Sequence, residues 1–234
     1  MLKSDYTAIE NYMTECMNDS AHDREHVYRV LYGAMDIAKS ESGVDFDILT
    51  AACLLHDIGR AEQFADPKLC HAEVGSEKAY RFLLKLGWSE ERAKRVRDCV
   101  KTHRFRSGCP PESIEAKILF DSDKLDVSGA IGIARTLFYK GKVGEPLYRL
   151  NLDGTVSDGG SDTEPSFFRE YKFKLENLYD KFFTKRGKEL AEGRRRAAVD
   201  FYNRLLSEVR SEYETGRGLL KRVVEDDKGD SYRP

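Results

Sequence analysis

The sequence has little of what marks several large classes of protein. Its net charge is only −2 and its isoelectric point is about 6.3, so it lacks the basic excess that drives non-specific binding to nucleic acid. Its five cysteines form no Cys-x-x-Cys pair and are odd in number, which argues against a disulfide framework and against a thiolate zinc site. Unpaired cysteines are typical of a reducing compartment, and we expect a cytoplasmic protein.

Long apolar runs are also absent. Residues 1–5 lack the apolar core of a secretory signal, and no segment approaches the ~20 apolar residues that cross a membrane. We therefore expect a soluble monomer or homodimer that binds neither membranes nor duplex nucleic acid.

Alternating strand patterns are nearly absent as well, whereas apolar residues recur at helical spacing throughout. This pattern predicts an all-α, single-domain bundle of about eight helices. The chain of 234 residues, 40% of them hydrophobic, can bury one sizeable core. We expect a domain over residues 1–222, with its core at about 21–213 and a polar tail at 223–234. The predicted helices cover residues 5–18, 23–41, 46–58, 70–86, 89–104, 112–139, 164–184 and 187–213.

Helical periodicity stops between residues 141 and 166, where glycines and aspartates cluster. Long irregular loops in compact domains tend to be functional or disordered. We expect this segment to be either a lid over a site or a mobile insertion, with a short hairpin at about 152–156 as a further option.

The most informative feature is a His-Asp pair within an apolar helical run, Cys53-Leu-Leu-His-Asp-Ile-Gly59. An imidazole and a carboxylate buried side by side are costly to desolvate, so we expect a divalent cation between His56 and Asp57. Gly59 fits the end of that helix, where the chain would turn away and leave the ion room.

Two other segments carry side chains of the kind that bind metals. His26 lies at the edge of the apolar stripe of the expected helix 23–41. Farther along, an apolar run at 118–120 is followed by three carboxylates, Asp121, Asp123 and Asp126. One of these carboxylates can complete the ligand set of the ion.

This order of one histidine, a His-Asp pair and a distant aspartate resembles the HD superfamily of metal-dependent phosphohydrolases, whose ligands lie on separate helices. The resemblance implies four metal ligands, which are His26, His56, Asp57 and Asp123. It selects Asp123 because a basic and an apolar residue follow the family's terminal aspartate, as they do here. Asp121 and Asp126 are then candidates to orient a ligand or a water molecule.

The resemblance covers about residues 21–212. Residues 128–135 and 188–194 are similar to stretches of a bacterial group of stand-alone HD hydrolases. The implied fold is an HD-type helical bundle, and the implied cofactor is a divalent metal ion. We favour Mn²⁺ or Mg²⁺, although Fe, Co, Ni and Zn also accept histidine and carboxylate ligands.

An ion held by histidine and carboxylate, with positions left for water and substrate, can acidify water and neutralise phosphoryl charge. The expected activity is therefore hydrolysis of a small phosphorylated metabolite by a mononuclear metal site, with a nucleotide as the favoured substrate and a pyrophosphate or monoester bond as the target. Two alternatives stay open. One is a metal-containing nucleotide-binding or regulatory module without turnover, and the other is a diiron oxygenase, which needs more than four ligands.

Further cations and histidines favour an anionic substrate. In related HD enzymes such residues contact phosphate oxygens, and the matching positions here are Arg60, His71, His103, Arg104 and Lys124. The two histidines have a competing use, because in binuclear relatives histidines in this part of the chain bind a second ion. For Arg60 and Lys124 the alternative is an ordinary surface salt bridge.

One position departs from the pattern. The nucleotidase branch of the superfamily carries an acidic residue three positions after the aspartate of the pair, whereas this chain has Arg60. The general acid or base is therefore unassigned, and its candidates are Asp57, Glu62, His71 and His103.

Overall fold

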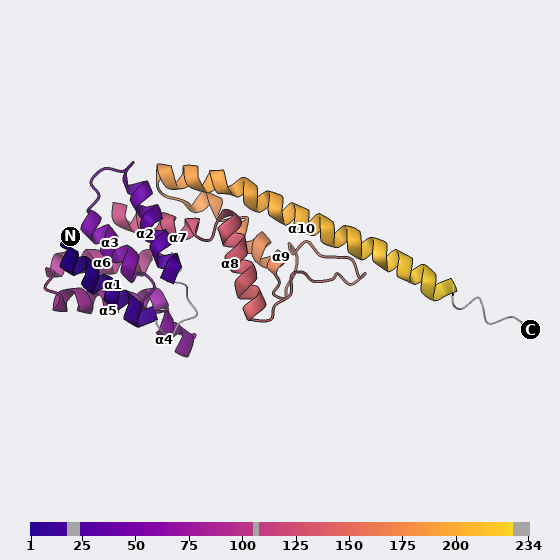
Figure 1. The fold of residues 1–234 in the computed structure, drawn as a ribbon, viewed down its shortest axis with the longest axis horizontal. Helices are drawn as coiled ribbons and strands as arrows, with labels where there is room; N and C mark the ends of the chain where they lie inside the picture. Colours follow the sequence, from indigo (N-terminus) through magenta and orange to yellow (C-terminus); the bar gives the residue numbers. More distant parts are fainter. Residues whose placement is uncertain (18–23, 105–107, 227–234) are drawn as a thin grey trace, which may run out of the picture. The chain divides into compact units, whose positions relative to one another are not determined.

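A computed structural model describes residues 1–17, 24–104 and 108–226, and these residues are predominantly helical (Figure 1). Their only β-pairing is an isolated antiparallel bridge between Leu150 and Val156. The all-α prediction is confirmed. No helix in this part of the chain combines the length and apolar character needed to cross a membrane.

Contacts divide the chain into two compact units. Unit 1 comprises Met1–Asp126 and Asp180–Gly193, and unit 2 comprises Val127–Tyr179 and the chain from Arg194 onward. The chain thus leaves unit 1 once and returns to it for a short segment. The boundaries expected for one domain over residues 1–222 stay a prediction.

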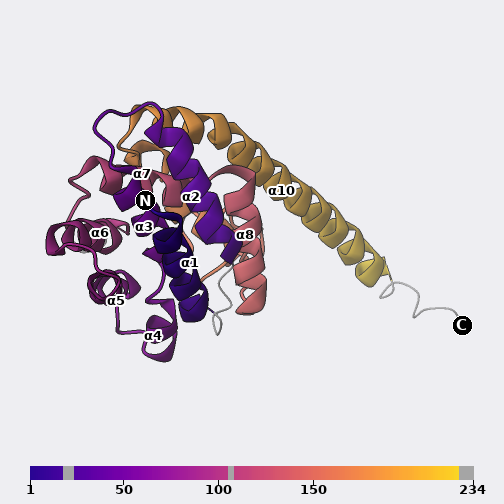
Figure 2. The same cartoon turned by 60° about the vertical axis from the view of Figure 1, so that its left-hand side comes forward.

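Unit 1 is built around α3, the most apolar of its helices. Seven of the ten residues of α3 are buried, because a helix that is apolar on most sides is stable only inside a core. It contacts α1, α2, α5, α6 and α7, and Figure 2 shows it among several of these helices. The bounds in unit 1 are α1 (Lys3–Met17), α2 (Arg24–Ala38), α3 (Phe46–Leu55), α4 (Arg60–Ala65), α5 (His71–Lys85), α6 (Glu90–Thr102) and α7 (Ile114–Leu125).

The helix starts expected at residues 46 and 89 are confirmed to within one residue. The Asp45 carboxylate accepts hydrogen bonds from the backbone N–H groups of Asp47 and Ile48, and the Ser89 hydroxyl accepts one from that of Arg92. Such caps satisfy N–H groups that have no partner within the helix, and each contributes about 1 kcal/mol. The ends expected at residues 18 and 23 lie outside the described residues.

The single helix expected over 112–139 is wrong, because the chain forms two helices there. α7 ends at Leu125, and α8 (Gly129–Lys142) begins after an extended Ser128. Gly129 has a φ of +60°, which is unfavourable for residues with a side chain. Similarly, the helix expected over 46–58 stops at Leu55, and the short α4 follows it.

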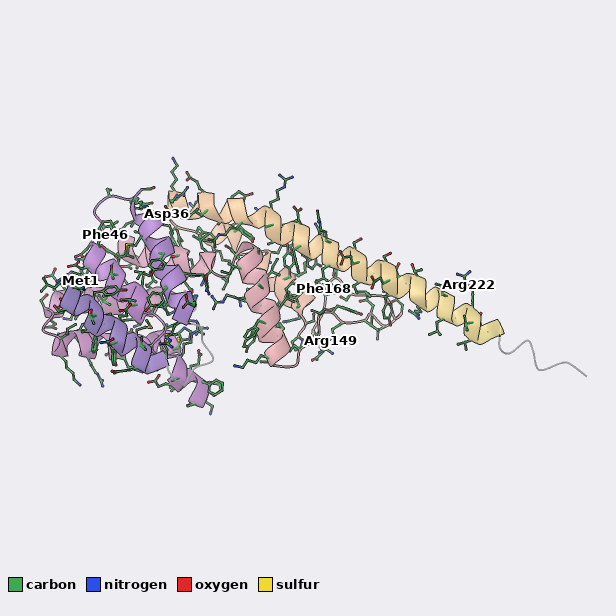
Figure 3. The ribbon with its side chains drawn as sticks, in the orientation of Figure 1. Met1, Asp36, Phe46, Arg149, Phe168 and Arg222 are labelled. Carbon is green, nitrogen blue, oxygen red and sulfur yellow. The ribbon has the colours of Figure 1, made fainter. Side chains whose placement is uncertain are left out.

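The helix expected over 164–184 is also interrupted. It consists of α9 (Phe167–Glu170), a π-helical turn η1 (Tyr171–Leu175) and a 3₁₀ turn η2 (Tyr179–Lys181). Five apolar side chains at helical spacing in this segment nevertheless belong to the core, since they are almost fully buried. These are Phe168, labelled in Figure 3, Tyr171, Leu175, Leu178 and Phe182.

In unit 2 the segment expected as an irregular loop, 141–166, is tied to the last helix, α10 (Lys185–Asp226). Arg210 of α10 donates to the backbone carbonyl of Val156 at 3.1 Å and 3.2 Å, and Arg217 donates to that of Gly154 at 2.8 Å. The bridge at Leu150 and Val156 corresponds to the hairpin option at 152–156. A lid function for this segment stays a prediction.

α10 extends well beyond the end expected at residue 213 and continues through 223–226, where we expected a polar tail. The rest of that tail, 227–234, lies outside the described residues. The first turns of α10 belong to unit 1, where Arg186 pairs with Asp36 of α2, labelled in Figure 3, at 3.1 Å. This pair is partly exposed and contributes little stability.

Candidate metal centre

Four histidines and two aspartates converge inside unit 1, each near the end of a helix. All are buried except Asp123, whose side chain is 13% exposed. They are His26 in the first turn of α2, His56 and Asp57 directly after α3, His71 at the start of α5, His103 directly after α6, and Asp123 in the last turn of α7.

The four ligands implied by the family resemblance lie together. His26 Nε2 is 3.3 Å from His56 Nε2 and 3.4 Å from Asp123 Oδ1. Asp57 Oδ2 lies 3.6 Å from Nε2 of both His26 and His56. We call His26, His56 and Asp123, together with Asp57 Oδ2, the first ligand group; its three named residues offer atoms within 4.8 Å of one another.

The other oxygen of Asp57 faces a second set of histidines. Asp57 Oδ1 is 3.2 Å from His71 Nε2 and 3.7 Å from His103 Nε2, and these two nitrogens are 3.4 Å apart. We call Asp57 Oδ1, His71 and His103 the second ligand group. The Asp57 carboxylate therefore lies between the two groups.

The outward-facing ring nitrogens of His56 and His103 show where their protons are. His56 Nδ1 lies 2.7 Å from the carbonyl of Cys53, and His103 Nδ1 lies 2.6 Å from that of Val100. A carbonyl can only accept, so each Nδ1 carries the proton and donates it. Each Nε2 then has a lone pair that faces the ligand groups.

The same assignment holds for His26 and His71. His26 Nδ1 donates to Asp126 Oδ2 at 2.7 Å, and the Asp126 carboxylate also accepts from Arg29 at 2.7 Å. His71 Nδ1 lies 2.6 Å from Gln63 Oε1, and the Gln63 amide is oriented by its own N–H, which donates to Leu69 O at 2.9 Å. His26 therefore points a lone pair inward, and so does His71 in the tautomer that donates to Gln63. In that tautomer Arg104 Nη1, 3.1 Å from His71 Nδ1, makes no hydrogen bond to it.

Without a cation this arrangement is unfavourable. Two pairs of lone-pair nitrogens face each other at 3.3 Å and 3.4 Å, and both oxygens of the buried Asp57 lack a hydrogen-bond partner among the described residues. A buried carboxylate without donors costs several kcal/mol, whereas a divalent cation in each ligand group would compensate every one of these atoms. The donor set therefore fits metal ions.

The protonation states suit metal binding as well. Burial lowers the pKa of His56 to about 4 and that of His71 to about 3, although Asp57 acts in the opposite direction. Burial alone would raise the pKa of Asp57, but neighbouring His56 and the Arg60 guanidinium hold it well below its usual value. Near neutral pH these imidazoles are uncharged and the carboxylate is ionised, as metal ligands must be.

Of the two aspartates expected to orient a ligand, Asp126 does so by holding His26. Asp121 does not. Its carboxylate accepts hydrogen bonds from the backbone N–H groups of Phe183 and Thr184 at 2.9 Å and 2.7 Å, and from the Thr184 hydroxyl at 2.6 Å. Asp121 therefore anchors the segment that returns to unit 1.

Three of the cations predicted to bind phosphate lie beside these groups. Arg60 Nε is 3.0 Å from Asp57 Oδ1, Lys124 Nζ is 3.1 Å from Asp123 Oδ2, and Arg104 Nη1 is 3.1 Å from His71 Nδ1. The side chains of Arg60 and Lys124 are 28% and 22% exposed, so both are within reach of solvent.

Glu62, a predicted acid or base, is engaged elsewhere. Its Oε1 pairs with Lys78 Nζ at 2.6 Å, and Lys78 also donates to the carbonyl of Ile58 at 2.8 Å. Gly59 differs from expectation too, since α3 has already ended at Leu55. A Cβ at Gly59 would lie 2.3 Å from the carbonyl oxygen of His71, so this glycine lets the start of α5 approach the His-Asp pair.

Sequence reasoning missed Gln63. Nothing in its sequence neighbourhood marks it, because its role depends on the position of His71 eight residues later and on the fold of the intervening turn. For Asp126 there was a signal, namely a carboxylate shortly after the terminal ligand.

Comparison with known proteins agrees with this geometry. The HD domain family model matches residues 24–128, which include both ligand groups. The protein YpgQ of Bacillus subtilis is 30% identical over 207 residues, which cover 87% of this chain and 91% of YpgQ.

Two solved structures are similar over nearly the same extent. The crystal structure of Bacillus subtilis YpgQ in complex with ADP has a TM-score of 0.68 at 27% identity and covers 88% of this chain and 95% of that one. A predicted HD superfamily hydrolase from an uncultured Thermotogales bacterium has a TM-score of 0.59 at 28% identity, with 86% and 90% covered. The chain therefore belongs to the HD superfamily of hydrolases.

Proposed function

We propose that this protein is a metal-dependent phosphohydrolase that hydrolyses a small phosphorylated metabolite. One observation carries the proposal: four imidazole lone pairs and a buried carboxylate without a hydrogen-bond partner in the described structure face the same interior space, next to Arg60, Arg104 and Lys124. Metal ligands beside basic side chains suit a substrate that carries several negative charges.

Each ligand group would hold one divalent cation in this proposal, with Asp57 offering one oxygen to each group. The second group offers two imidazoles and a single carboxylate oxygen, a set that favours Mn²⁺ or another transition metal over Mg²⁺. When bound, such ions acidify water and neutralise phosphoryl charge. His71 and His103 then serve as ligands, which is the competing use that the sequence left open.

The chain's own residues supply positioning and charge. Arg60, Arg104 and Lys124 attract and orient the phosphoryl oxygens. None of the four acid or base candidates is well placed for proton transfer, since Asp57, His71 and His103 face the ligand groups and Glu62 pairs with Lys78. We infer that solvent protonates the leaving group.

We favour a nucleotide as the substrate. The support is that YpgQ, similar over 88% of this chain, has been crystallised with ADP. A nucleoside diphosphate or triphosphate carries the adjacent negative charges that two cations and three basic side chains would neutralise.

A diiron oxygenase is a second candidate, because it needs more than four ligands and the two ligand groups together supply six residues. A requirement for O₂ distinguishes this activity from hydrolysis. An oxygenase needs iron and consumes O₂, whereas a phosphohydrolase works anaerobically with Mn²⁺.

The test uses metal-stripped protein and a panel of nucleoside mono-, di- and triphosphates, with release of phosphate and pyrophosphate measured anaerobically after adding Mn²⁺. We expect Mn²⁺-dependent release that Asp57→Ala abolishes. Asp98→Ala is the matched control, since Asp98 is exposed and pairs only with its neighbour Arg97 in the described structure. Tight nucleotide binding with the ligand recovered intact would favour the module without turnover instead.

A further inference from the structure

Arg60 contacts the one oxygen on which the second ligand group depends. Its Nε lies 3.0 Å from Asp57 Oδ1, closer than the nearest atom of His71 at 3.2 Å or of His103 at 3.7 Å. A guanidinium and a divalent cation would therefore share this oxygen and repel each other across a short, buried distance.

The first ligand group has no such competitor. Asp57 Oδ2 faces His26 and His56, and no lysine or arginine in the described part of the chain forms an ion pair with this oxygen. Lys124 pairs with Oδ2 of Asp123, which leaves Oδ1 facing His26. The first group thus keeps two oxygens for an ion, whereas the only oxygen of the second is already paired.

The ion pair between Arg60 and Asp57 lacks a hydrogen bond through Arg60 Nε. This Nε is buried but has no hydrogen-bond partner in the described structure, because its N–H does not point at Asp57 Oδ1 despite the short distance. A buried donor without an acceptor is unfavourable, and a phosphate oxygen would satisfy it with a charge-assisted hydrogen bond.

We propose that Arg60 couples the second cation to the anionic substrate. Without substrate it occupies Asp57 Oδ1 and keeps the affinity of the second group for a cation low. A bound phosphate group draws the guanidinium away and frees that oxygen. Because coupling between two sites is reciprocal, the cation raises the affinity for the anion by the same factor as the anion raises the affinity for the cation.

This inference rests on the proposed binding of two metal ions, and it goes beyond that function by giving Arg60 control over the order of loading. If Arg60 were only a counter-ion that stabilises buried Asp57, its removal would lower stability and leave the two cation affinities in their original ratio. The two roles therefore differ in a quantity that can be measured without turnover.

The experiment is a Mn²⁺ titration of metal-stripped protein, followed by calorimetry and by the electron paramagnetic resonance signal of a coupled Mn²⁺ pair. It is run with and without inorganic phosphate, and free Mn²⁺ is corrected with a blank. For the unmodified protein we expect one tight ion and a second at least about tenfold weaker. Phosphate should raise the affinity for the second ion several-fold and leave the affinity for the first ion unchanged.

In Arg60→Met the second ion should bind at least about tenfold more tightly than in the unmodified protein, and phosphate should no longer tighten it. Arg60→Lys keeps the charge and should retain the weak second site, which covers the case in which the methionine variant does not fold. Arg81→Met, at an exposed position of α5, is the matched control and should behave like the unmodified protein.

Two equally tight ions in the unmodified protein would overturn the inference and leave the proposed function intact. An unchanged second site in Arg60→Met, in protein shown to be folded by circular dichroism, would overturn it as well. Absence of any Mn²⁺ binding would instead overturn the proposed function itself.

Discussion

The two ligand groups share one carboxylate but balance its charge differently. The first takes its ligands from the ends of α2, α3 and α7, and one of its imidazoles is held by an Asp126–Arg29 ion pair. The second takes its histidines from the ends of α5 and α6 and meets a guanidinium at its only oxygen. Similar ligand types at similar distances can therefore form two sites of unequal affinity, because the neighbouring charges differ.

The largest effect is expected from Asp57→Ala, which removes the oxygens of both groups. Bound metal should fall from two ions per chain to none, and hydrolysis should fall more than about 10³-fold. Elemental analysis and initial rates measure the two quantities. Retention of either ion at full affinity would contradict the shared role of this carboxylate.

His26→Ala and His103→Ala separate the two groups. His26→Ala should remove the tight ion, whereas His103→Ala should leave the tight ion in place and remove the weaker one. Both should lower the rate by about 10²-fold or more if both ions take part in the reaction. Loss of the tight ion from His103→Ala, measured by calorimetry with Mn²⁺, would reverse the assignment.

Asp126→Asn should have a smaller effect, restricted to the first group. The asparagine can still accept a proton from His26 Nδ1 but lacks the charge that makes the imidazole a stronger ligand. Loss of a residue that hydrogen-bonds a metal ligand typically weakens metal binding by about 10- to 100-fold. Affinity of the second group, which has no contact with Asp126, should be unchanged, and equal weakening of both sites would argue against a local role.

The last prediction concerns the pH dependence of stability instead of metal binding, through one histidine from each group, His56 and His71. Burial lowers the pKa of His56 to about 4 and of His71 to about 3, from an ordinary value of 6.5. Below pH 6.5 the unfolded chain gains protons that the folded protein does not, so stability is lost as pH falls from 6.5 towards 4. The loss is about 1.4 kcal/mol per pH unit for each group.

Urea unfolding of metal-stripped protein at several pH values in this range measures the loss. A free energy of unfolding that stays constant between pH 6.5 and 5 would show that these imidazoles are not buried in their neutral form. In His56→Gln, whose side chain cannot be protonated, the free energy of unfolding should fall less steeply as the pH is lowered.

Several parts of the fold were predictable because their signals are local. The caps at Asp45 and Ser89 depend on residues within one turn, and the apolar stripe from Phe168 to Phe182 depends on helical spacing alone. The break between α7 and α8 was not predictable in this way. Asp126 looks like a helical residue by its neighbours, but its carboxylate is held by His26 and Arg29, about 100 positions earlier in the chain.

The same distinction applies to the site. The sequence by itself determined which residue types stand in which order, namely a histidine, a His-Asp pair in an apolar run and three aspartates after another apolar run. The family resemblance then predicted Asp123 as the fourth ligand. The sequence left open whether His71 and His103 contact phosphate or a second ion, and what Arg60 does.

Only the tertiary structure decided which nitrogen of each histidine faces inward and which oxygen of Asp57 meets Arg60. The physical reason is that a histidine's tautomer and a carboxylate's charge environment are set by contacts at about 3 Å between helices far apart in sequence. Composition and spacing can place such residues on the same helix face, but distances of that size depend on how the helices pack.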